Sequence, residues 1–217
     1  MPTQKNKVEL LEYAGSDISH ARAAWASTNQ EVTPDKIKRI AKLLKFLADN
    51  EHGTPFEHSM LSFHIQGDIA SHIHCLKHRT GVSINTESAR YKEMKDDLFY
   101  LPEEFSYQNN DDLPDSPSLT GLVEDLHTLY HQMLTFLVED KKINRSRAKE
   151  VARYILPYSH QLRWVMTFNF RSFMHFQKLR NSEHAQVEIK EIAENMLDLV
   201  KYQTDSKFTH SLKAFNL

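Results

Sequence analysis

Three parts of the sequence bring together side chains that suit a phosphorylated ligand. They comprise residues 55–58, residues 77–91, and residues 152–153 with 169–180, and they are rich in Arg, His, Asn or Ser. Arg makes planar, bidentate hydrogen bonds to phosphate oxygens, and the hydroxyl of Ser88 beside Arg90 adds a neutral donor. Asn offers both a donor and an acceptor to the edge of a ring. The set predicts a pocket for a phosphorylated, ring-bearing ligand rather than a hydrolytic triad.

The third of these parts contains a helical pattern that addresses two places. Arg171 and His175 lie four residues apart and share a helix face. Arg180 lies nine residues after Arg171, about half a turn away at roughly 100° per residue. One helix therefore serves two sites, or two parts of a site built from different subunits. Each residue also has a plain structural explanation, because Arg180 can pair with Glu183 and His58 can be a structural histidine.

Two further histidines have the spacing of a zinc site. His74 and His78 lie four residues apart on an expected helix, a spacing that can bind zinc. No His-Glu-x-x-His motif accompanies them, the spacing fixes no carboxylate as a third ligand, and Lys77 between them repels a cation. We expect no metal here.

The composition limits the class of protein. The chain has 217 residues, 27 Lys and Arg against 29 Asp and Glu, and a single cysteine. The near balance of charge excludes a tail-driven nucleic-acid binder or a polybasic membrane binder. No apolar stretch approaches the ~20 residues of a membrane helix, and the N-terminus lacks the pattern of a secretory signal. One cysteine fits a reducing compartment, so we expect a cytoplasmic protein.

The elements that must position these side chains are mostly helices, since 5 Gly and 7 Pro are few. Asp17 and Asp68 are expected to cap two of the helices, and residues 80–91 show no period. The chain is predicted to form one α+β domain over residues 1–217. Strands are expected at 7–13, 60–65 and 161–170, helices at 18–25, 34–50, 69–79, 118–142, 146–155, 171–180 and 185–202, and a surface loop at 101–119.

In this order and near these spacings, the motifs resemble those of the flavin-dependent thymidylate synthases, from about residue 17 to 216. The residues that carry the resemblance are Pro55-Phe56-Glu57-His58, Lys77-His78-Arg79 with Ser88-Ala89-Arg90-Tyr91, Ala152-Arg153-Tyr154-Ile155-Leu156-Pro157, Asn169-Phe170-Arg171-Ser172 with Phe176 and Leu179-Arg180, and Ala185-Gln186-Val187-Glu188-Ile189.

The resemblance implies a methyltransferase and flavoprotein of nucleotide biosynthesis. That family makes dTMP from dUMP, with methylenetetrahydrofolate as carbon donor and NADPH as reductant through FAD. It implies a mixed α/β fold with a central, mostly antiparallel sheet, and a homotetramer whose active sites are shared between subunits. It implies no nucleic-acid or membrane partner.

The resemblance also assigns roles by position. Ser88 and Arg90 fall near the nucleotide phosphate and Arg180 near the reacting uracil, where positive charge would stabilise the charge that develops on the ring. Ser88 and Arg180 are the catalytic candidates. The residues implied to bind dUMP are His74, Ser88, Ala89, Arg90, Arg153 and Arg180; those implied to bind FAD are His58, Lys77, His78, Arg79, Glu87, Asn169, Arg171 and His175.

The cysteine content agrees with such a mechanism. The unrelated thymidylate synthase attacks uracil with a cysteine thiolate, but Cys75 lacks the Pro-Cys context of that enzyme and lies on an apolar helix stripe. We interpret Cys75 as a buried structural residue. The chain then offers no protein nucleophile, and the transfer belongs to the flavin.

Several positions depart from the family pattern and keep two alternatives open. Lys77 replaces an Arg of the signature, eight residues rather than seven separate Arg79 from Ser88, and His74 replaces a glutamine. Thr86 replaces a glutamate whose role Glu87 can take over. One alternative is a related flavoprotein that makes a different one-carbon-modified uracil nucleotide. The other is a non-catalytic nucleotide- or RNA-binding protein.

Overall fold

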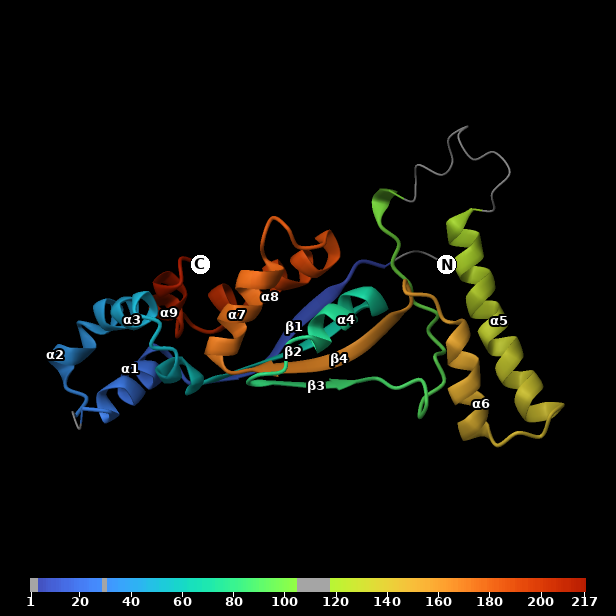
Figure 1. Cartoon of the computed structure of the whole chain (residues 1–217), viewed down its shortest axis with the longest axis horizontal. Helices are drawn as coiled ribbons and strands as arrows, with labels where there is room; N and C mark the ends of the chain where they lie inside the picture. Colours follow the sequence, from blue (N-terminus) through green and yellow to red (C-terminus); the bar gives the residue numbers. More distant parts are fainter. Residues whose placement is uncertain (1–3, 29–30, 105–117) are drawn as a thin grey trace. The chain divides into compact units, whose positions relative to one another are not determined.

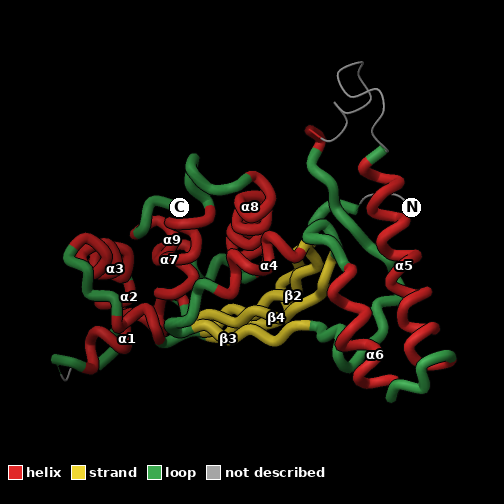
Figure 2. Tube along the Cα trace, turned by 45° about the vertical axis from the view of Figure 1, so that its right-hand side comes forward, coloured by secondary structure: helices red, strands yellow, loops and turns green. Residues whose placement is uncertain are grey.

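The computed structural model describes residues 4–28, 31–104 and 118–217. Its strands are β1 (Lys7–Ala14), β2 (Met60–Asp68), β3 (Val82–Thr86) and β4 (Gln161–Phe168), which form one antiparallel sheet in the order β1-β2-β4-β3 (Figure 2). The strands expected at 7–13, 60–65 and 161–170 are confirmed with shifted ends. The expected helix-rich α+β class, with an antiparallel sheet, is confirmed as well.

Strand β3 was not expected from the sequence. Val82, Ile84 and Thr86 are half-buried and alternate with exposed residues, which is the pattern of a strand at the edge of a sheet. The alternation covers only five residues, so it is too short to stand out in the sequence. Pairing with β4 decides it, and just beyond the two strands Asn169 N donates to Gly81 O at 3.1 Å.

The chain divides into two compact units, each built from separate stretches of sequence. Unit 1 comprises residues 1–6, 66–75 and 86–164, and unit 2 comprises residues 7–65, 76–85 and 165–217. Strands β2, β3 and β4 contribute residues to both.

Unit 1 contains most of α4 (Ile69–Leu76), and all of α5 (Leu119–Glu139), α6 (Arg145–Ala152) and a 3-10 turn at Arg153–Ile155. Helices α5 and α6 pack against each other (Figure 1). Their contact buries a small apolar core of Met94, Tyr130, Leu134, Leu137, Ala148 and Ala152.

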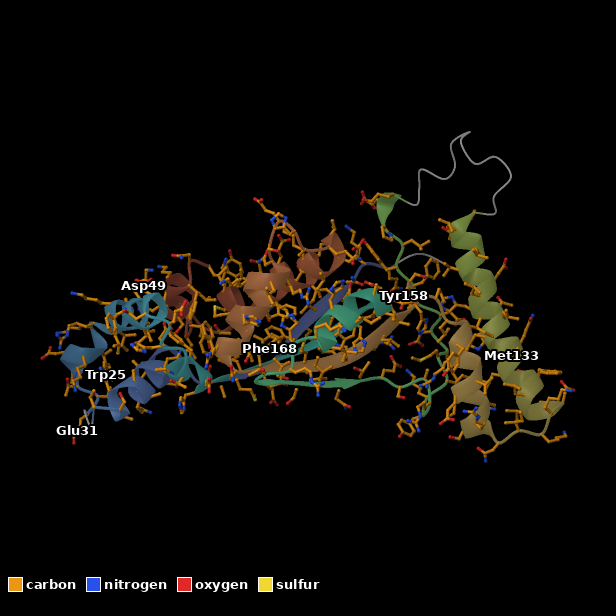
Figure 3. The ribbon with its side chains drawn as sticks, viewed as in Figure 1. Trp25, Glu31, Asp49, Met133, Tyr158 and Phe168 are labelled. Atoms are coloured by element: carbon orange, nitrogen blue, oxygen red, sulfur yellow. The ribbon has the colours of Figure 1, made fainter. Side chains whose placement is uncertain are left out.

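Unit 2 contains the other helices described here. They are α1 (Asp17–Ala26), α2 (Pro34–Ile37), α3 (Ile40–Asp49), a 3-10 turn at Thr54–Glu57, α7 (Phe170–Arg180), α8 (Val187–Gln203) and α9 (Thr209–Ala214). Their core is strongly aromatic. Phe168, labelled on β4 in Figure 3, packs edge-on against Phe173 and Phe176 of α7, with ring centroids 5.7 and 5.3 Å away. This packing fixes α7 against the end of β4.

Several helix boundaries differ from the sequence prediction. The helix expected at 34–50 is broken between Ile37 and Ile40, and Ile37 is exposed, so the apolar stripe joined two separate elements. The helix expected at 69–79 ends at Leu76, which leaves residues 77–79 in the following turn. Helix α9 was not predicted. The expected loop at 101–119 lies largely outside the described residues.

The two expected caps have different outcomes. Asp68 does cap α4, since its carboxylate accepts hydrogen bonds from Ser71 N and Ser71 Oγ, both at 2.8 Å. Asp17 does not cap α1, because it is the first residue of that helix and Ser16 is the N-cap. Its carboxylate instead accepts hydrogen bonds from the backbone N–H groups of His210 and Ser211, at the start of α9.

Candidate functional site

In unit 2, the start of α7 is joined to the turn that follows residues 77–79. Asn169 caps α7 by accepting a hydrogen bond from Ser172 N at 2.8 Å, and Ser172 Oγ donates to Thr80 O at 2.7 Å. Gly81 has a φ of +64°, and a Cβ at this position would lie 2.4 Å from Ser172 Oγ. Only glycine fits without strain. The turn therefore brings the segment after residues 77–79 into contact with the start of α7.

The C-terminal end of α7 also contacts residues 77–79. Arg180 Nε donates to His78 Nε2 at 3.0 Å, and the His78 ring contacts the rings of His175 and Phe176, with centroids 5.9 and 4.9 Å away. Because a guanidinium only donates, His78 Nε2 is the acceptor and the neutral ring carries its proton on Nδ1. His78 is 8% exposed. Three predicted site residues thus form one cluster.

Residues 55–58 are linked to α7 by an ion pair. Arg171 Nη1 lies 2.6 Å from Glu57 Oε1, and both side chains are partly exposed. A Cβ on Gly53 would lie 2.6 Å from Arg171 Nε, so the guanidinium passes directly over this glycine. An exposed pair of this kind adds little stability. Its effect is to orient Glu57, and His58 next to it, relative to α7.

The remaining predicted flavin contacts of unit 2 are exposed. Lys77 and Arg79 lie in the turn after α4, and His58, Arg171 and His175 are exposed as well. A set of cationic side chains with an asparagine amide has the chemistry needed for a diphosphate and the edge of a ring. The residues present therefore fit a flavin dinucleotide.

In unit 1, three of the predicted nucleotide residues, Ser88, Ala89 and Arg90, lie in a tight turn. Ser88 O accepts hydrogen bonds from Tyr91 N and Lys92 N, both at 3.0 Å, and Ser88 Oγ accepts one from Arg90 N at 3.3 Å. The Glu87 carboxylate braces the turn, with Lys92 Nζ at 2.6 Å from Oε1 and Arg163 N at 3.3 Å from Oε2. Sequence reasoning missed Lys92 in this role.

Glu150 links that turn to the segment of Arg153. Arg90 Nε donates to Glu150 Oε1 at 3.2 Å, and Arg147 lies 3.0 Å from the other oxygen. The hydrogen bond from Arg147 first, and then that from Arg90, hold the pKa of Glu150 below its usual range. Arg153 begins the 3-10 turn directly after α6 and lies over the Tyr154 ring. Ala89 packs against the α5–α6 core.

Helix α4 contributes two histidines to unit 1. His74, a predicted nucleotide contact, is half-buried. His72 is buried, with Nε2 2.7 Å from Thr86 Oγ1 and its ring against Trp164, and burial lowers its pKa. Thr86 lies at the position of the glutamate in the family pattern, and its hydroxyl bonds to His72. The sequence did not indicate this contact.

The geometry behind the zinc alternative is not present. Helix α4 ends at Leu76, so His74 and His78 do not share a helix face. Within residues 4–28, 31–104 and 118–217, no three His, Cys, Asp or Glu side chains are arranged to hold a metal ion. Nor does any helix in these ranges combine the length and apolar character needed to cross a bilayer.

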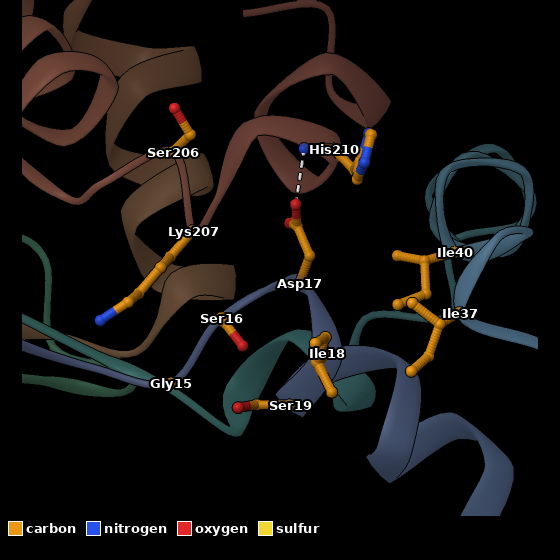
Figure 4. A pocket seen from close by; sticks show the side chains of 10 residues that line it. All are labelled: Gly15, Ser16, Asp17, Ile18, Ser19, Ile37, Ile40, Ser206, Lys207 and His210. Carbon is orange, nitrogen blue, oxygen red and sulfur yellow. Dashed lines mark hydrogen bonds between the residues drawn. The ribbon is translucent and has the colours of Figure 1, made fainter. Parts of the chain in front are cut away.

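Unit 2 also has a cavity of about 540 Å³ that no motif predicted. It lies where α1, α2, α3 and the segment before α9 meet, and Figure 4 shows Asp17 directed at the backbone of His210 beside it. None of the predicted site residues lines it. Its lining residues are Gly15, Ser16, Asp17, Ile18, Ser19, Ile37, Ile40, Ser206, Lys207 and His210.

Residues 9–204 match the family described as thymidylate synthase complementing protein, and the chain belongs to this family. A flavin-dependent thymidylate synthase of Thermosipho melanesiensis is 32% identical over 214 residues, covering 96% of this chain and 91% of the relative. One of Pseudothermotoga lettingae is 32% identical over 187 residues, covering 86% and 80%. The resemblance seen in the motifs is confirmed.

A solved structure agrees with this assignment. The UMP/dUMP methylase PolB from Streptomyces cacaoi, bound with 5-Br dUMP, superimposes with a TM-score of 0.76 at 26% identity. The match covers 98% of this chain and 95% of that one.

Proposed function

We propose that this protein methylates dUMP to dTMP as a flavin-dependent thymidylate synthase. One observation carries the proposal: in a chain of this family, the motifs gather into two compact clusters of cationic and amide side chains, one in each unit. Methylenetetrahydrofolate is the proposed carbon donor, NADPH the reductant and FAD the cofactor.

The proposed flavin residues are His58, Lys77, His78, Arg79, Glu87, Asn169, Arg171 and His175. Bound flavin would supply the reducing equivalents that turn the transferred one-carbon unit into a methyl group. The protein's part is to hold the dinucleotide with cations and to aim them through fixed partners. The Glu57–Arg171 pair and the Asn169 cap are such partners.

The proposed dUMP residues are His74, Ser88, Ala89, Arg90, Arg153 and Arg180. Ser88 and Arg90 are assigned to the phosphate, for which a turn with a hydroxyl and a guanidinium is well suited. Arg180 is assigned to the uracil, where its charge would stabilise negative charge that develops on the ring. The bond to His78 restrains the plane of its guanidinium.

Cys75 supports a mechanism without a protein nucleophile. It is 0% exposed, within α4. A catalytic thiolate needs access to its substrate and a polar surrounding that lowers its pKa. The buried cysteine also suits the reducing cytoplasm, which we propose as the location.

We further propose a homotetramer with shared active sites and a single functional domain over residues 1–217. Arg171 and Arg180 lie on one helix about half a turn apart, and we assign them to different ligands. The family match runs from residue 9 to 204 through both units.

A second candidate is a related methylase with a different uracil nucleotide as substrate or product. Two observations favour it: Thr86 bonds to His72 where the family has a glutamate, and PolB is described as a UMP/dUMP methylase.

An anaerobic assay with FAD, NADPH, methylenetetrahydrofolate and either dUMP or UMP tests both candidates. We expect dTMP, identified by mass, from dUMP, and its loss in Ser88→Ala and Arg180→Ala. A different mass or a preference for UMP would favour the second candidate. A folded protein that binds no FAD and methylates neither nucleotide would contradict both.

A further inference from the structure

Four side chains in unit 2 form a continuous hydrogen-bond chain that no sequence motif indicates. Ser59 Oγ lies 2.9 Å from His20 Nε2, His20 Nδ1 lies 2.8 Å from Ser211 Oγ, and Ser211 Oγ lies 2.6 Å from Asp17 Oδ1. The residues come from α1, from α9 and from the start of the segment leading into β2. They link parts of the sequence up to 194 residues apart.

The direction of every bond in the chain follows from the groups involved. An ionised carboxylate only accepts, so the Ser211 hydroxyl donates to Asp17 and its oxygen accepts from His20 Nδ1–H. A neutral imidazole has one N–H, so Nε2 accepts from the Ser59 hydroxyl. His20 is 0% exposed, and burial first, then the nearby His58, lower its pKa to about 4, which keeps it neutral near pH 7.

The hydrogen-bond chain ends at Ser59, the residue that follows His58. On the other side of His58, Phe56 is fully buried, and its ring packs edge-on against His20 and Phe215, with centroids 5.3 and 4.9 Å away. Residues 56–59 form a corner that also packs against Gly15. A Cβ on Gly15 would lie 2.8 Å from Ser59 Cβ and 3.1 Å from His58 O. The exposed His58 therefore lies between the buried Phe56 and the half-buried Ser59, both in contact with His20.

Backbone hydrogen bonds fix the start of the corner better than its end. Phe56 N donates to Gly53 O at 3.0 Å. The bond from His58 N to Pro55 O is 3.5 Å long, at the limit of a hydrogen bond. A 3-10 turn of four residues has poor internal geometry. The orientation of residues 57–59 thus depends mainly on side chains. Arg171 holds Glu57 from one side, and His20 is the group that Phe56 and Ser59 both contact.

We propose that His20 is a positioning residue, whose hydrogen bonds to Ser59 and, through Ser211, to Asp17 hold the corner 56–59 so that Glu57 and His58 face the flavin. The inference rests on the proposed function, because it is a flavin that this corner would meet. His20 itself touches no reacting group in this scheme.

The test uses Ser59→Ala and Ser211→Ala, which each break the chain on one side of His20, and the double variant. Ser62→Ala is the matched control, since it removes a buried hydroxyl on the adjacent strand that bonds Thr167 and is outside the chain. Two quantities are measured: hydrogen exchange of the peptide covering residues 55–60 in flavin-free protein, and the dissociation constant of FAD.

We expect faster exchange in this peptide and about fivefold weaker FAD binding in each chain variant, the loss of one buried hydrogen bond. The double variant should be little worse than either single one, because both break the same chain. Ser62→Ala should lower thermal stability by a similar amount and leave the dissociation constant of FAD unchanged.

Each other outcome counts against the inference in a distinguishable way. Unchanged exchange, or faster exchange with unchanged FAD affinity, would overturn it and leave the proposed function standing. Equal weakening of FAD binding in Ser62→Ala would show a general loss of stability and also overturn it. If the unaltered protein binds no FAD, the proposed function fails, and this inference fails with it.

Discussion

Arg180 and His78 are hydrogen-bonded to each other, Nε to Nε2 at 3.0 Å, although 102 residues separate them in the sequence. The bond joins the last turn of α7 to the turn after α4. It sets the tautomer of the histidine and restrains the guanidinium, so the two residues are expected to act as a pair.

Replacing Arg180 should abolish methylation without unfolding the protein. We expect Arg180→Ala to lower the rate of dTMP formation by about 10²-fold or more, the usual effect of removing a group that stabilises developing charge. Arg180→Lys should be nearly as poor, because Lys lacks the Nε–H that bonds His78 and the planar fork. Lys178→Ala, exposed on the same helix, is the control and should stay active. A fully active Arg180→Ala enzyme would refute the assigned role.

Replacing Gly81 should disrupt the contact between the turn after residues 77–79 and the start of α7. In Gly81→Ala, the new Cβ would overlap Ser172 Oγ in a backbone conformation with a φ of +64°. We expect the free energy of unfolding, measured in urea, to fall by about 2 kcal/mol or more, together with a loss of FAD affinity. Gly121→Ala is the matched control, since Gly121 lies in helix α5, where Ala is favoured. Equal stability of the two variants would contradict the close contact.

The Lys92–Glu87 ion pair supports the turn of residues 88–91, and removing it should weaken the binding of dUMP. Lys92→Ala deletes the partner of Glu87 across residues 88–91, and we expect the KM for dUMP to rise by up to about fivefold, the upper end of what a solvent-exposed ion pair contributes. Steady-state kinetics at saturating FAD measure this. Lys95→Ala removes an exposed charge three residues away and should leave the KM unchanged. A similar rise in both variants would point to overall charge rather than to this ion pair.

The protein should lose stability in mild acid. Burial first, aided by His58 for His20 and by His127 for His160, lowers the pKa of each of these two histidines to about 4. The unfolded chain binds these protons near pH 6.5, whereas the folded chain binds them only near pH 4. The stability is therefore complete above pH 6.5 and is lost as the pH falls toward 4, by about 3 kcal/mol for each histidine.

Urea unfolding at pH 7.5, 6.0 and 5.0 measures this loss. His160→Asn should reduce the slope of stability against pH by about one proton, whereas His184→Asn, at an exposed position, should not change it. A stability that does not change between pH 7.5 and 5 would contradict the prediction.

Local patterns in the sequence were sufficient to predict most of the elements. Partial alternation predicted β2, aromatic and β-branched residues predicted β4, and a short run of residues predicted β1. Apolar spacing predicted most of the helices. Asp68 was recognised as a cap because it acts on Ser71, three residues away. The motifs were also sufficient to recognise the family, since their residue types and order can be read without the fold.

Only the tertiary structure decided the contacts between distant parts of the chain. Asp17 looks like a cap for α1, yet its carboxylate binds α9, and His20 carries no motif although it connects Ser59 with Ser211. Strand β3 and the end of α4 at Leu76 likewise depend on pairing and on the turn at Gly81. Cap and periodicity signals act over three or four residues, whereas these partners lie tens to nearly two hundred residues apart, and packing alone selects them.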